Sequence, residues 1–299
     1  MQDYQHGGSP AQPLIRIAIG AVCISFAPVL VKAVSGGIPG PTGIGMYRCL
    51  IGAALLFLAA LQRRDKLMLP GKVMALLALA GFIFFLDRFV WHRSIILAGA
   101  GMATILGNTQ VFATAVLSLL LFREKLSGRF IVAAVSAMAG VILLVGIGSD
   151  VTFGDRYLQG IVFGLLTGIV YASFLITVRQ VGRIPGNGTN LTRIAWISLF
   201  SGLFLGIAAL VEGDVGPPPD LKTWSLLFLL ALVAQSAGWL LIARSLPKVS
   251  GAVGGLLLLL QPVLATVWGA LIFREHLEPV QMIGAAITLV AIYVGSLSR

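Results

Sequence analysis

Several large polar side chains stand inside apolar stretches of this sequence. Asn108 and Gln110 lie in one stretch, Gln235 lies in a second and Gln261 in a third. A helix cannot satisfy a carboxamide internally, so these amides indicate either a binding site or hydrogen bonds between neighbouring helices. No nucleophile–base pair, metal cluster or Asp-rich motif accompanies them. We therefore expect binding of a small polar molecule and no enzyme activity.

Arg48 is the one basic residue that lies clearly within an apolar stretch. It stands seven residues after Pro41, which corresponds to a depth of roughly 10 Å in a helix. Its forked guanidinium is suited to a carboxylate. The alternative is a side chain that extends back to the lipid headgroups. Arg193, a candidate counterpart near the start of a later stretch, is expected to anchor its helix at the membrane surface.

Aromatic residues near these polar groups are candidates for the walls of the same site. Trp239 follows Gln235 by four positions, which places both on one face of a helix. Tyr171 lies similarly deep, whereas Trp91 and His92 stand where a stretch is expected to end. Trp and Tyr also populate membrane–water interfaces, and Trp91 fits that alternative better than the deeper rings do.

Gln261 is followed directly by Pro262. Proline removes a backbone donor and frees a carbonyl one turn earlier, so we expect a kink at this point. A kink would place exposed backbone beside the Gln261 amide near the middle of the membrane.

Metal and redox chemistry have no support in the sequence. Cys23 and Cys49 both lie in apolar runs and are expected to be small packing residues. The three histidines form no HExxH pattern and the cysteines form no CxxC pattern. No metal and no cofactor are expected.

The overall composition is that of a membrane protein. Hydrophobic residues make up 58% of the 299 residues and charged residues only 11%, whereas soluble domains carry about 25% charged residues. A net charge of +10 would suggest a nucleic-acid partner in a soluble protein. Beside apolar spans, basic residues instead report membrane orientation. We expect a small molecule and membrane lipids as partners, and no nucleic acid.

Ten apolar stretches have the length of about 20 residues that a membrane-crossing helix needs. The expected spans are Leu14–Val34, Pro41–Leu61, Lys72–Trp91, Ser94–Phe122, Arg129–Ile147, Leu158–Val181, Leu191–Val211, Leu221–Ala243, Val249–Phe273 and Val280–Leu297. With the N-terminus inside, 14 basic residues fall on the inner side and six on the outer side. This bias predicts that both termini are cytoplasmic. The polar tail of residues 1–13 is expected to be retained, because the apolar run after it lacks a charged n-region and an A-x-A cleavage site.

The sequence repeats itself at an offset of 151 residues. Residues 121–126 read LFREKL, residues 272–277 read IFREHL, and Gln110 aligns with Gln261. Each half holds five spans, and because five is odd the second half enters the membrane from the opposite side. Inverted repeats around a midplane site are typical of secondary transporters that work by alternating access. Further candidate pairs, at offsets that drift by a few residues, are Lys32 with Arg179 and Arg48 with Arg193.

These features resemble the drug/metabolite transporter superfamily in its ten-span form with two EamA-type repeats. The residues that carry the resemblance are the duplicated Phe122-Arg123-Glu124 and Phe273-Arg274-Glu275, and the run from Gln261 to Ala265 before the second copy. The resemblance covers nearly the whole chain. It implies an all-α integral membrane fold, with ten transmembrane helices arranged as two inverted five-helix repeats, residues 14–148 and 157–297, around a central cavity.

Within this superfamily, the chain is similar to bacterial inner-membrane exporters of amino acids, particularly aromatic ones. The implied function is export of aromatic and other neutral amino acids and related metabolites by alternating access. Amide and aromatic walls suit a zwitterion with an apolar side chain. One chain supplies both repeats, so a monomer suffices, and the sequence does not set the oligomeric state.

The acidic residues bear on how such transport is driven. The deepest are Asp87, Glu124 and Glu275, all expected at helix ends. Proton-coupled carriers usually rely on a buried carboxylate or histidine, so facilitative transport or exchange is favoured. The alternative is a proton-coupled exporter of drugs or cationic compounds. A membrane-embedded enzyme is disfavoured because no catalytic constellation is present.

Small residues on the fifth and tenth spans predict close packing between helices. We expect them to hold the two repeats together rather than to touch substrate. They are Ala133, Ser136, Ala137, Gly140, Gly284 and Thr288.

Overall fold

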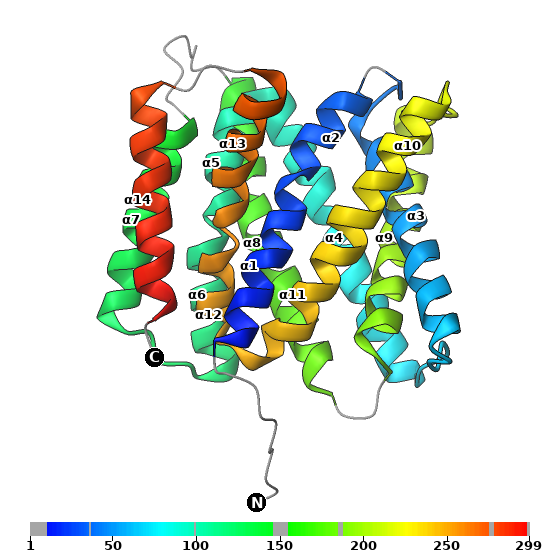
Figure 1. The fold of residues 1–299 in the computed structure, drawn as a ribbon, viewed down its shortest axis with the longest axis horizontal. Helices are drawn as coiled ribbons and strands as arrows, with labels where there is room; N and C mark the ends of the chain where they lie inside the picture. Colours follow the sequence, from blue (N-terminus) through cyan, green and yellow to red (C-terminus); the bar gives the residue numbers. More distant parts are fainter. Residues whose placement is uncertain are drawn as a thin grey trace, which may run out of the picture.

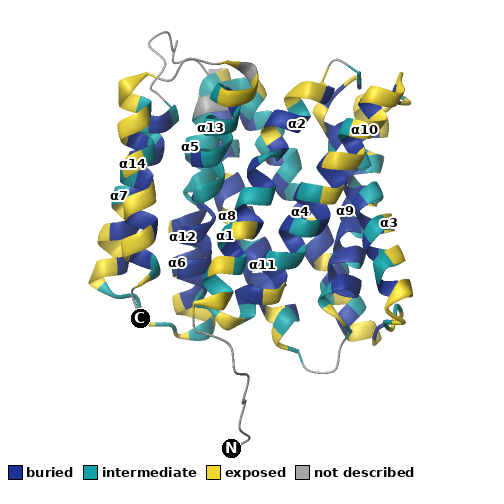
Figure 2. Cartoon of the chain, in the orientation of Figure 1, coloured by how far each residue is buried: buried dark blue, intermediate teal, exposed yellow. Residues whose placement is uncertain are grey.

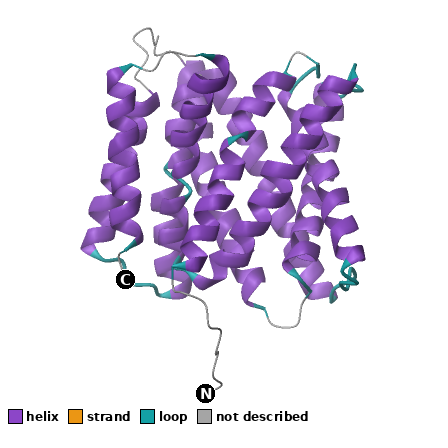
Figure 3. Cartoon of the chain, viewed as in Figure 1, coloured by secondary structure: helices purple, strands orange, loops and turns teal. Residues whose placement is uncertain are grey.

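The chain folds into a bundle of helices. The computed structural model describes residues 11–35, 37–98, 100–145, 155–184, 188–274 and 278–297. In these residues all regular structure is helical (Figure 3). Ten helical segments are long and apolar enough to cross a membrane, which confirms the ten expected spans. Most of the expected N-terminal tail, residues 1–10, lies outside the described residues.

Several spans consist of more than one helix. The helices are α1 (Gln12–Ser25), α2 (Ala27–Val34), α3 (Pro41–Gln62), α4 (Gly71–Ala98), α5 (Ala100–Asn108), α6 (Gln110–Phe122), α7 (Gly128–Val145), α8 (Asp155–Arg183), α9 (Asn190–Glu212), α10 (Leu221–Leu230), the π-helix η1 (Ala231–Gly238), α11 (Trp239–Ser245), the 3₁₀-helix η2 (Leu246–Lys248), α12 (Gly251–Leu257), α13 (Leu260–Phe273) and α14 (Pro279–Ser296). The first span is α1 with α2, the fourth is α5 with α6, the eighth runs from α10 to η2, and the ninth is α12 with α13.

The two halves of the chain are inverted relative to each other. Helix α1 begins and α14 ends at the same end of the bundle, which we call the terminal end (Figure 1). Five spans later, α8 begins at the other end, which we call the opposite end. The inverted repeats implied by the sequence are therefore present in the fold.

The repeat extends to details of the backbone. The fourth span breaks at Thr109 and the ninth at Leu258 and Leu259, close to the repeat offset. Both copies of the Phe-Arg-Glu motif end their helix in the left-handed conformation, with φ 54° and ψ 33° at Arg123 and φ 56° and ψ 35° at Arg274. The break in the ninth span also confirms the kink expected near Pro262, since the ring removes the donor that would reach Leu258.

Helices α7 and α14 form a pair at the periphery of the bundle (Figure 1). A Cβ on Gly140 would lie 2.7 Å from the carbonyl oxygen of Gly284, so the two backbones touch. Thr288 Oγ1 donates to the carbonyl oxygen of Ala137 across the pair at 3.3 Å. Because α7 and α14 come from different repeats, the small residues join the repeats as predicted.

The third span is longer than the sequence analysis predicted. It was expected to end at Trp91, yet α4 continues to Ala98. Arg93 stays within the helix because its guanidinium lies 3.4 Å from the centre of the Phe89 ring and 2.9 Å from Glu212 Oε1. Within the polar sequence Trp-His-Arg, Arg93 therefore has a partner on α9, and the helix continues past it.

This extension moves Asp87 away from the helix end where it was expected. Asp87 stands eleven residues before the end of α4, roughly 16 Å along the helix, and only 3% of its surface is exposed. The expectation that no carboxylate lies deep within a span is wrong for this residue.

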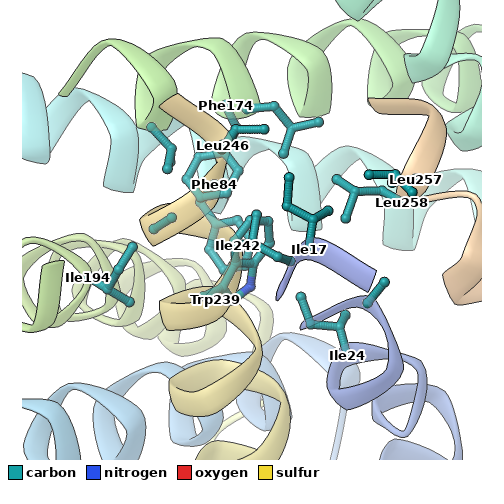
Figure 4. Close-up of a cluster of buried hydrophobic side chains, with 14 of the residues drawn as sticks. Ile17, Ile24, Phe84, Phe174, Ile194, Trp239, Ile242, Leu246, Leu257 and Leu258 are labelled. Carbon is teal, nitrogen blue, oxygen red and sulfur yellow. The ribbon is translucent and has the colours of Figure 1, made fainter. Parts of the chain in front are cut away.

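The apolar core is centred on Trp239 (Figure 4). This side chain is 1% exposed, and its ring centre lies 5.6 Å from that of Phe84 and 4.9 Å from that of Phe174. Towards the terminal end, every residue of α12 is buried, whereas α13, which continues the same span to the opposite end, is mainly half-buried (Figure 2). The ninth span is thus packed more tightly in its terminal half.

Candidate functional site

Six polar side chains from five helical segments come together inside the bundle. Hydrogen bonds, an ion pair and mutual electrostatic interactions connect them. We call this group the central polar cluster: Arg48 of α3, Asp87 and Arg88 of α4, Tyr171 of α8, Gln235 of η1 and Gln261 of α13.

Arg48 extends into the bundle and not back to the headgroups. Only 6% of the residue is exposed, and its Nε donates to Gln235 Oε1 at 3.0 Å. Gln235 in turn donates from Nε2 to Ser198 Oγ at 2.9 Å. Arg48 Nη2 is buried and has no hydrogen-bond partner among the described residues. The guanidinium therefore keeps a donor that can bind an anionic group inside the membrane.

Asp87 and Arg88 add two opposite charges to this site. Asp87 Oδ2 lies 3.4 Å from Arg88 Nε. The guanidinium of Arg88 lies 4.9 Å from the centre of the Phe84 ring and 5.9 Å from that of Trp91. Both charged residues interact electrostatically with Arg48. The cluster thus contains two cations and one anion.

Asp87 and Arg88 were not among the expected site residues. Both were expected at an outer helix end because Trp91, His92 and Arg93 resembled a loop. The apolar residues that follow, Ile95 to Ala98, were the available signal that the helix continues beyond them.

Tyr171, Gln261 and Trp239 form the aromatic and amide side of the site. Gln261 Nε2 donates to the Tyr171 hydroxyl at 3.5 Å. The Tyr171 ring meets the Trp239 ring edge-on, with their centres 6.3 Å apart. Trp239 Nε1 is buried without a hydrogen-bond partner among the described residues. Because Trp239 belongs to the apolar core, it closes the site towards the terminal end.

Trp91 and His92 lie inside α4 and not at its end. Trp91 contacts Arg88 through its ring face, and the Trp91 and His92 ring centres lie 5.6 Å apart. His92 Nδ1 is buried and has no hydrogen-bond partner among the described residues. Both side chains stand one turn beyond the Asp87–Arg88 pair, towards the opposite end.

The two amides of the fourth span have different surroundings. Asn108 is half-buried at the break between α5 and α6, where its Nδ2 donates to the Thr104 carbonyl one turn earlier at 2.7 Å. The expectation that a helix cannot satisfy a carboxamide internally is therefore wrong for Asn108, which is not part of the central polar cluster. Gln110 is 1% exposed and donates from Nε2 to the Gly255 carbonyl at 2.9 Å. It also accepts a hydrogen bond from Thr114 Oγ1 at 3.1 Å. Gln110 therefore joins α6 to α12, which is the interhelical alternative for this residue.

A second polar group closes the terminal end, and we call it the terminal latch: Glu124, Arg179, Val249 and Gly251. Arg179, 1% exposed, forms an ion pair with Glu124 and donates from Nη2 to the Val249 carbonyl at 2.7 Å. Glu124 Oε2 also accepts a hydrogen bond from the Gly251 N–H at 3.1 Å. These contacts tie together the end of α6, the end of α8 and the start of α12.

The repeat-related residues at the opposite end lie in a different environment. Arg274 and Lys32 are both exposed, and Glu275 lies outside the described residues. Arg193, the candidate counterpart of Arg48, lies instead at the terminal end, where it is 8% exposed and donates from Nη2 to the Ile184 carbonyl at 2.9 Å, so it caps the end of α8.

Comparison with known proteins identifies the family. Residues 13–146 and 158–297 each match the EamA-like transporter family. An uncharacterized transporter of Clostridium kluyveri is 27% identical over 273 residues, which cover 87% of this chain and 84% of that protein. Transporter YcbK of Bacillus subtilis is 24% identical over 90% of this chain and 88% of that protein. Protein PecM of Dickeya dadantii is 27% identical over 65% of this chain and 64% of that protein.

A solved crystal structure has the same fold. It superposes with a TM-score of 0.83 at 17% sequence identity, covering 97% of this chain and 99% of the other chain. The arrangement of ten helices is therefore shared over almost the whole molecule.

Proposed function

Because this chain belongs to the EamA-like transporter family of the drug/metabolite transporter superfamily, we propose that it exports amino acids, aromatic and other neutral ones, and related metabolites. Substrate would bind at the central polar cluster and reach either side of the membrane by alternating access. Arg48 carries this proposal, since it is a guanidinium buried within a span with a free Nη2 donor.

The surroundings of Arg48 fit a substrate with a carboxylate and an apolar part. A guanidinium binds a carboxylate through parallel N–H donors, and the interaction is strong where water is excluded. Tyr171 and Trp239 supply aromatic surface nearby, and the Gln261 amide supplies polar contacts. A few polar groups on mainly apolar walls are typical of small-molecule sites.

The proposed cycle uses the inverted repeats. The latch closes the terminal end, while the half-buried α13 lies towards the opposite end. Exchanging the roles of the two repeats would open the terminal end and close the opposite end. With both termini in the cytoplasm of a bacterial inner membrane, as the distribution of basic residues favours, the described conformation is closed towards the cytoplasm.

The driving force has to be reconsidered because of Asp87. Facilitative transport or exchange was favoured on the expectation that no carboxylate lies deep within a span, and Asp87 removes that support. Proton-coupled export of drugs or cationic compounds is therefore the second candidate function. Two arginines beside Asp87 make the cluster positive overall, which disfavours a cationic substrate.

The experiment is uptake of labelled phenylalanine into liposomes that contain the purified protein, with and without an imposed pH gradient. We expect saturable uptake that other neutral amino acids compete for. Equilibration that is independent of the gradient supports facilitated transport or exchange, and accumulation driven by the gradient supports proton coupling. Uptake no higher than in empty liposomes overturns the amino acid proposal, and cationic drugs are then the substrates to test.

Two repeat-related arginines provide the matched variants. Arg48→Gln should reduce phenylalanine uptake at least about tenfold, because a charge-assisted hydrogen bond to the substrate is lost. Arg193→Gln should reduce it less than about threefold, because Arg193 contacts a helix end and not the central polar cluster. Equal losses in the two variants would contradict the role proposed for Arg48.

A further inference from the structure

Asp87 is a carboxylate within a membrane span that the proposal above does not use. It is 3% exposed, and its position in α4 places it beside Arg88 and within electrostatic range of Arg48. A charged group in a membrane interior is costly unless it is paired, and such groups commonly mark substrate pathways. A buried carboxylate at this position is therefore a candidate substrate-binding group.

The geometry of the Asp87–Arg88 pair is that of a loose contact. Asp87 Oδ2 and Arg88 Nε are 3.4 Å apart, whereas charge-assisted N–H···O hydrogen bonds are typically about 2.7–2.9 Å long. In contrast, Arg179 of the terminal latch is held by both a carboxylate and a backbone carbonyl. Asp87 is thus free to accept a further cationic donor.

The charges of the site form a pattern that matches an amino acid. Arg48 offers a free donor for a carboxylate, and Asp87 offers an acceptor for an ammonium group. The same region holds the aromatic surface of Tyr171 and Trp239. A free α-amino acid carries all three features on neighbouring atoms.

We propose, building on the function proposed above, that Asp87 binds the α-ammonium group of the substrate while Arg48 and Arg88 bind its carboxylate. The three charges then select zwitterions, and compounds with only one of the two charges bind more weakly. This assigns substrate-binding roles to two residues, Asp87 and Arg88, and makes Asp87 the determinant of amino-group specificity.

The test compares three ligands that share a phenylethyl body. Phenylalanine carries both charged groups, 3-phenylpropionate lacks the ammonium group and phenethylamine lacks the carboxylate. Binding of each is measured by tryptophan fluorescence of the purified protein in detergent. The wild type should bind phenylalanine at least about tenfold more tightly than either of the other two, since each lacks one charge-assisted contact.

Asp87→Asn should bind phenylalanine and 3-phenylpropionate with nearly equal affinity, because the asparagine cannot pair with the ammonium charge. Arg48→Gln should instead lose most of the preference over phenethylamine. The readout is a ratio of affinities within one variant, so a general loss of folded protein does not change it. Asp87→Glu, which keeps the charge, should keep the preference for phenylalanine.

Glu212→Gln is the matched control, because this carboxylate pairs with Arg93 at the end of α9 and lies outside the central polar cluster. It should keep the wild-type ratios. An unchanged preference for phenylalanine over 3-phenylpropionate in Asp87→Asn would overturn the role of Asp87 alone, as would a wild type that binds these two equally. A wild type that binds none of the three ligands would overturn the proposed function as well.

Discussion

The two copies of the Phe-Arg-Glu motif have matching backbones and different surroundings. Arg123 and Arg274 both end their helices in the left-handed conformation, with φ 54° and 56°. At the terminal end, Glu124 of the first copy binds Arg179 and the N–H of Gly251. At the opposite end, Arg274 of the second copy is exposed. The duplicated sequence therefore produces the same local turn, and the described residues show a closed latch at the first copy.

The same contrast extends along the two broken spans. Helix α12 is buried throughout, whereas residues 102–106 of α5, which are repeat-related to 253–257 of α12, are only half-buried apart from Ala103. Two inverted repeats can exchange conformations through the pseudo-twofold axis that relates them, and a single structure shows one of the two resulting states. The difference between the two ends indicates which half must loosen for the other conformation to form.

Removing the Arg179–Glu124 ion pair of the terminal latch should cause the largest loss of stability. Arg179→Ala leaves the partly buried Glu124 carboxylate without its cation and should lower the free energy of unfolding by about 3 kcal/mol. Lys32→Ala, the change at the repeat-related exposed position, should lower it by less than about 0.5 kcal/mol. Denaturation of both variants in mixed detergent measures the difference. Equal destabilisation would contradict the assignment of the terminal end as the tightly packed one.

Adding a side-chain atom at Gly251 of the terminal latch should cause a smaller loss of stability. A Cβ on Gly251 would overlap Ser118 Oγ and lie 3.3 Å from Ile176 Cδ1. Gly251→Ala should therefore separate α12 from α6 and destabilise the protein by about 1–3 kcal/mol, measured as a drop in thermal unfolding temperature. Adding Ser118→Ala removes the overlapping atom and should restore part of the loss. Gly128→Ala is the control, because no atom lies within 4 Å of its Cβ position, and a comparable drop there would refute the packing explanation.

Glycine substitutions in the left-handed turns of the two motif copies should change the stability least. The left-handed conformation costs a residue other than glycine about 1 kcal/mol or more. Glycine avoids this cost, but part of the gain is offset because glycine loses more conformational freedom on folding. Arg123→Gly and Arg274→Gly should each stabilise the protein by about 0.5 kcal/mol. Thermal unfolding of the two single variants measures this gain. If one glycine variant were stabilised and the other destabilised, the side-chain contacts, and not the shared backbone conformation, would determine the stability of these turns.

Much of the fold follows from patterns that the linear sequence contains. Ten apolar stretches of membrane-crossing length, and a motif repeated after an odd number of spans, are enough to predict ten helices in two inverted halves. The small residues that pair α7 with α14 were also readable, since close backbone contact needs residues such as Gly140 and Gly284. Both predictions depend on local composition and periodicity, which tertiary contacts do not alter.

Only part of the candidate site could be predicted from the sequence. Arg48, Gln235, Tyr171 and Gln261 were expected from their depth, and the structure brings them together. Asp87 and Arg88 were missed because Trp91, His92 and Arg93 resembled a loop, whereas in the folded state Arg93 pairs with Glu212 of α9 and α4 continues to Ala98. The role of Gln110 was equally undetermined, because an amide facing a binding site and an amide facing a backbone carbonyl have the same sequence signature.

The sequence by itself determined the membrane class, the number of spans and the inverted repeat, because these depend on hydropathy and on the order of residues. Tertiary structure alone decided the surroundings of each member of a repeated pair: Arg179 is buried and Lys32 is exposed, whereas Arg48 and Arg193 are both buried beside different partners. Arg179 pairs with Glu124 and donates to the Val249 carbonyl, Arg193 donates to the Ile184 carbonyl, and Arg48 donates to Gln235 within the central polar cluster. A duplicated sequence offers the same side chain twice, and its role is fixed only by the groups that the fold brings within hydrogen-bonding distance.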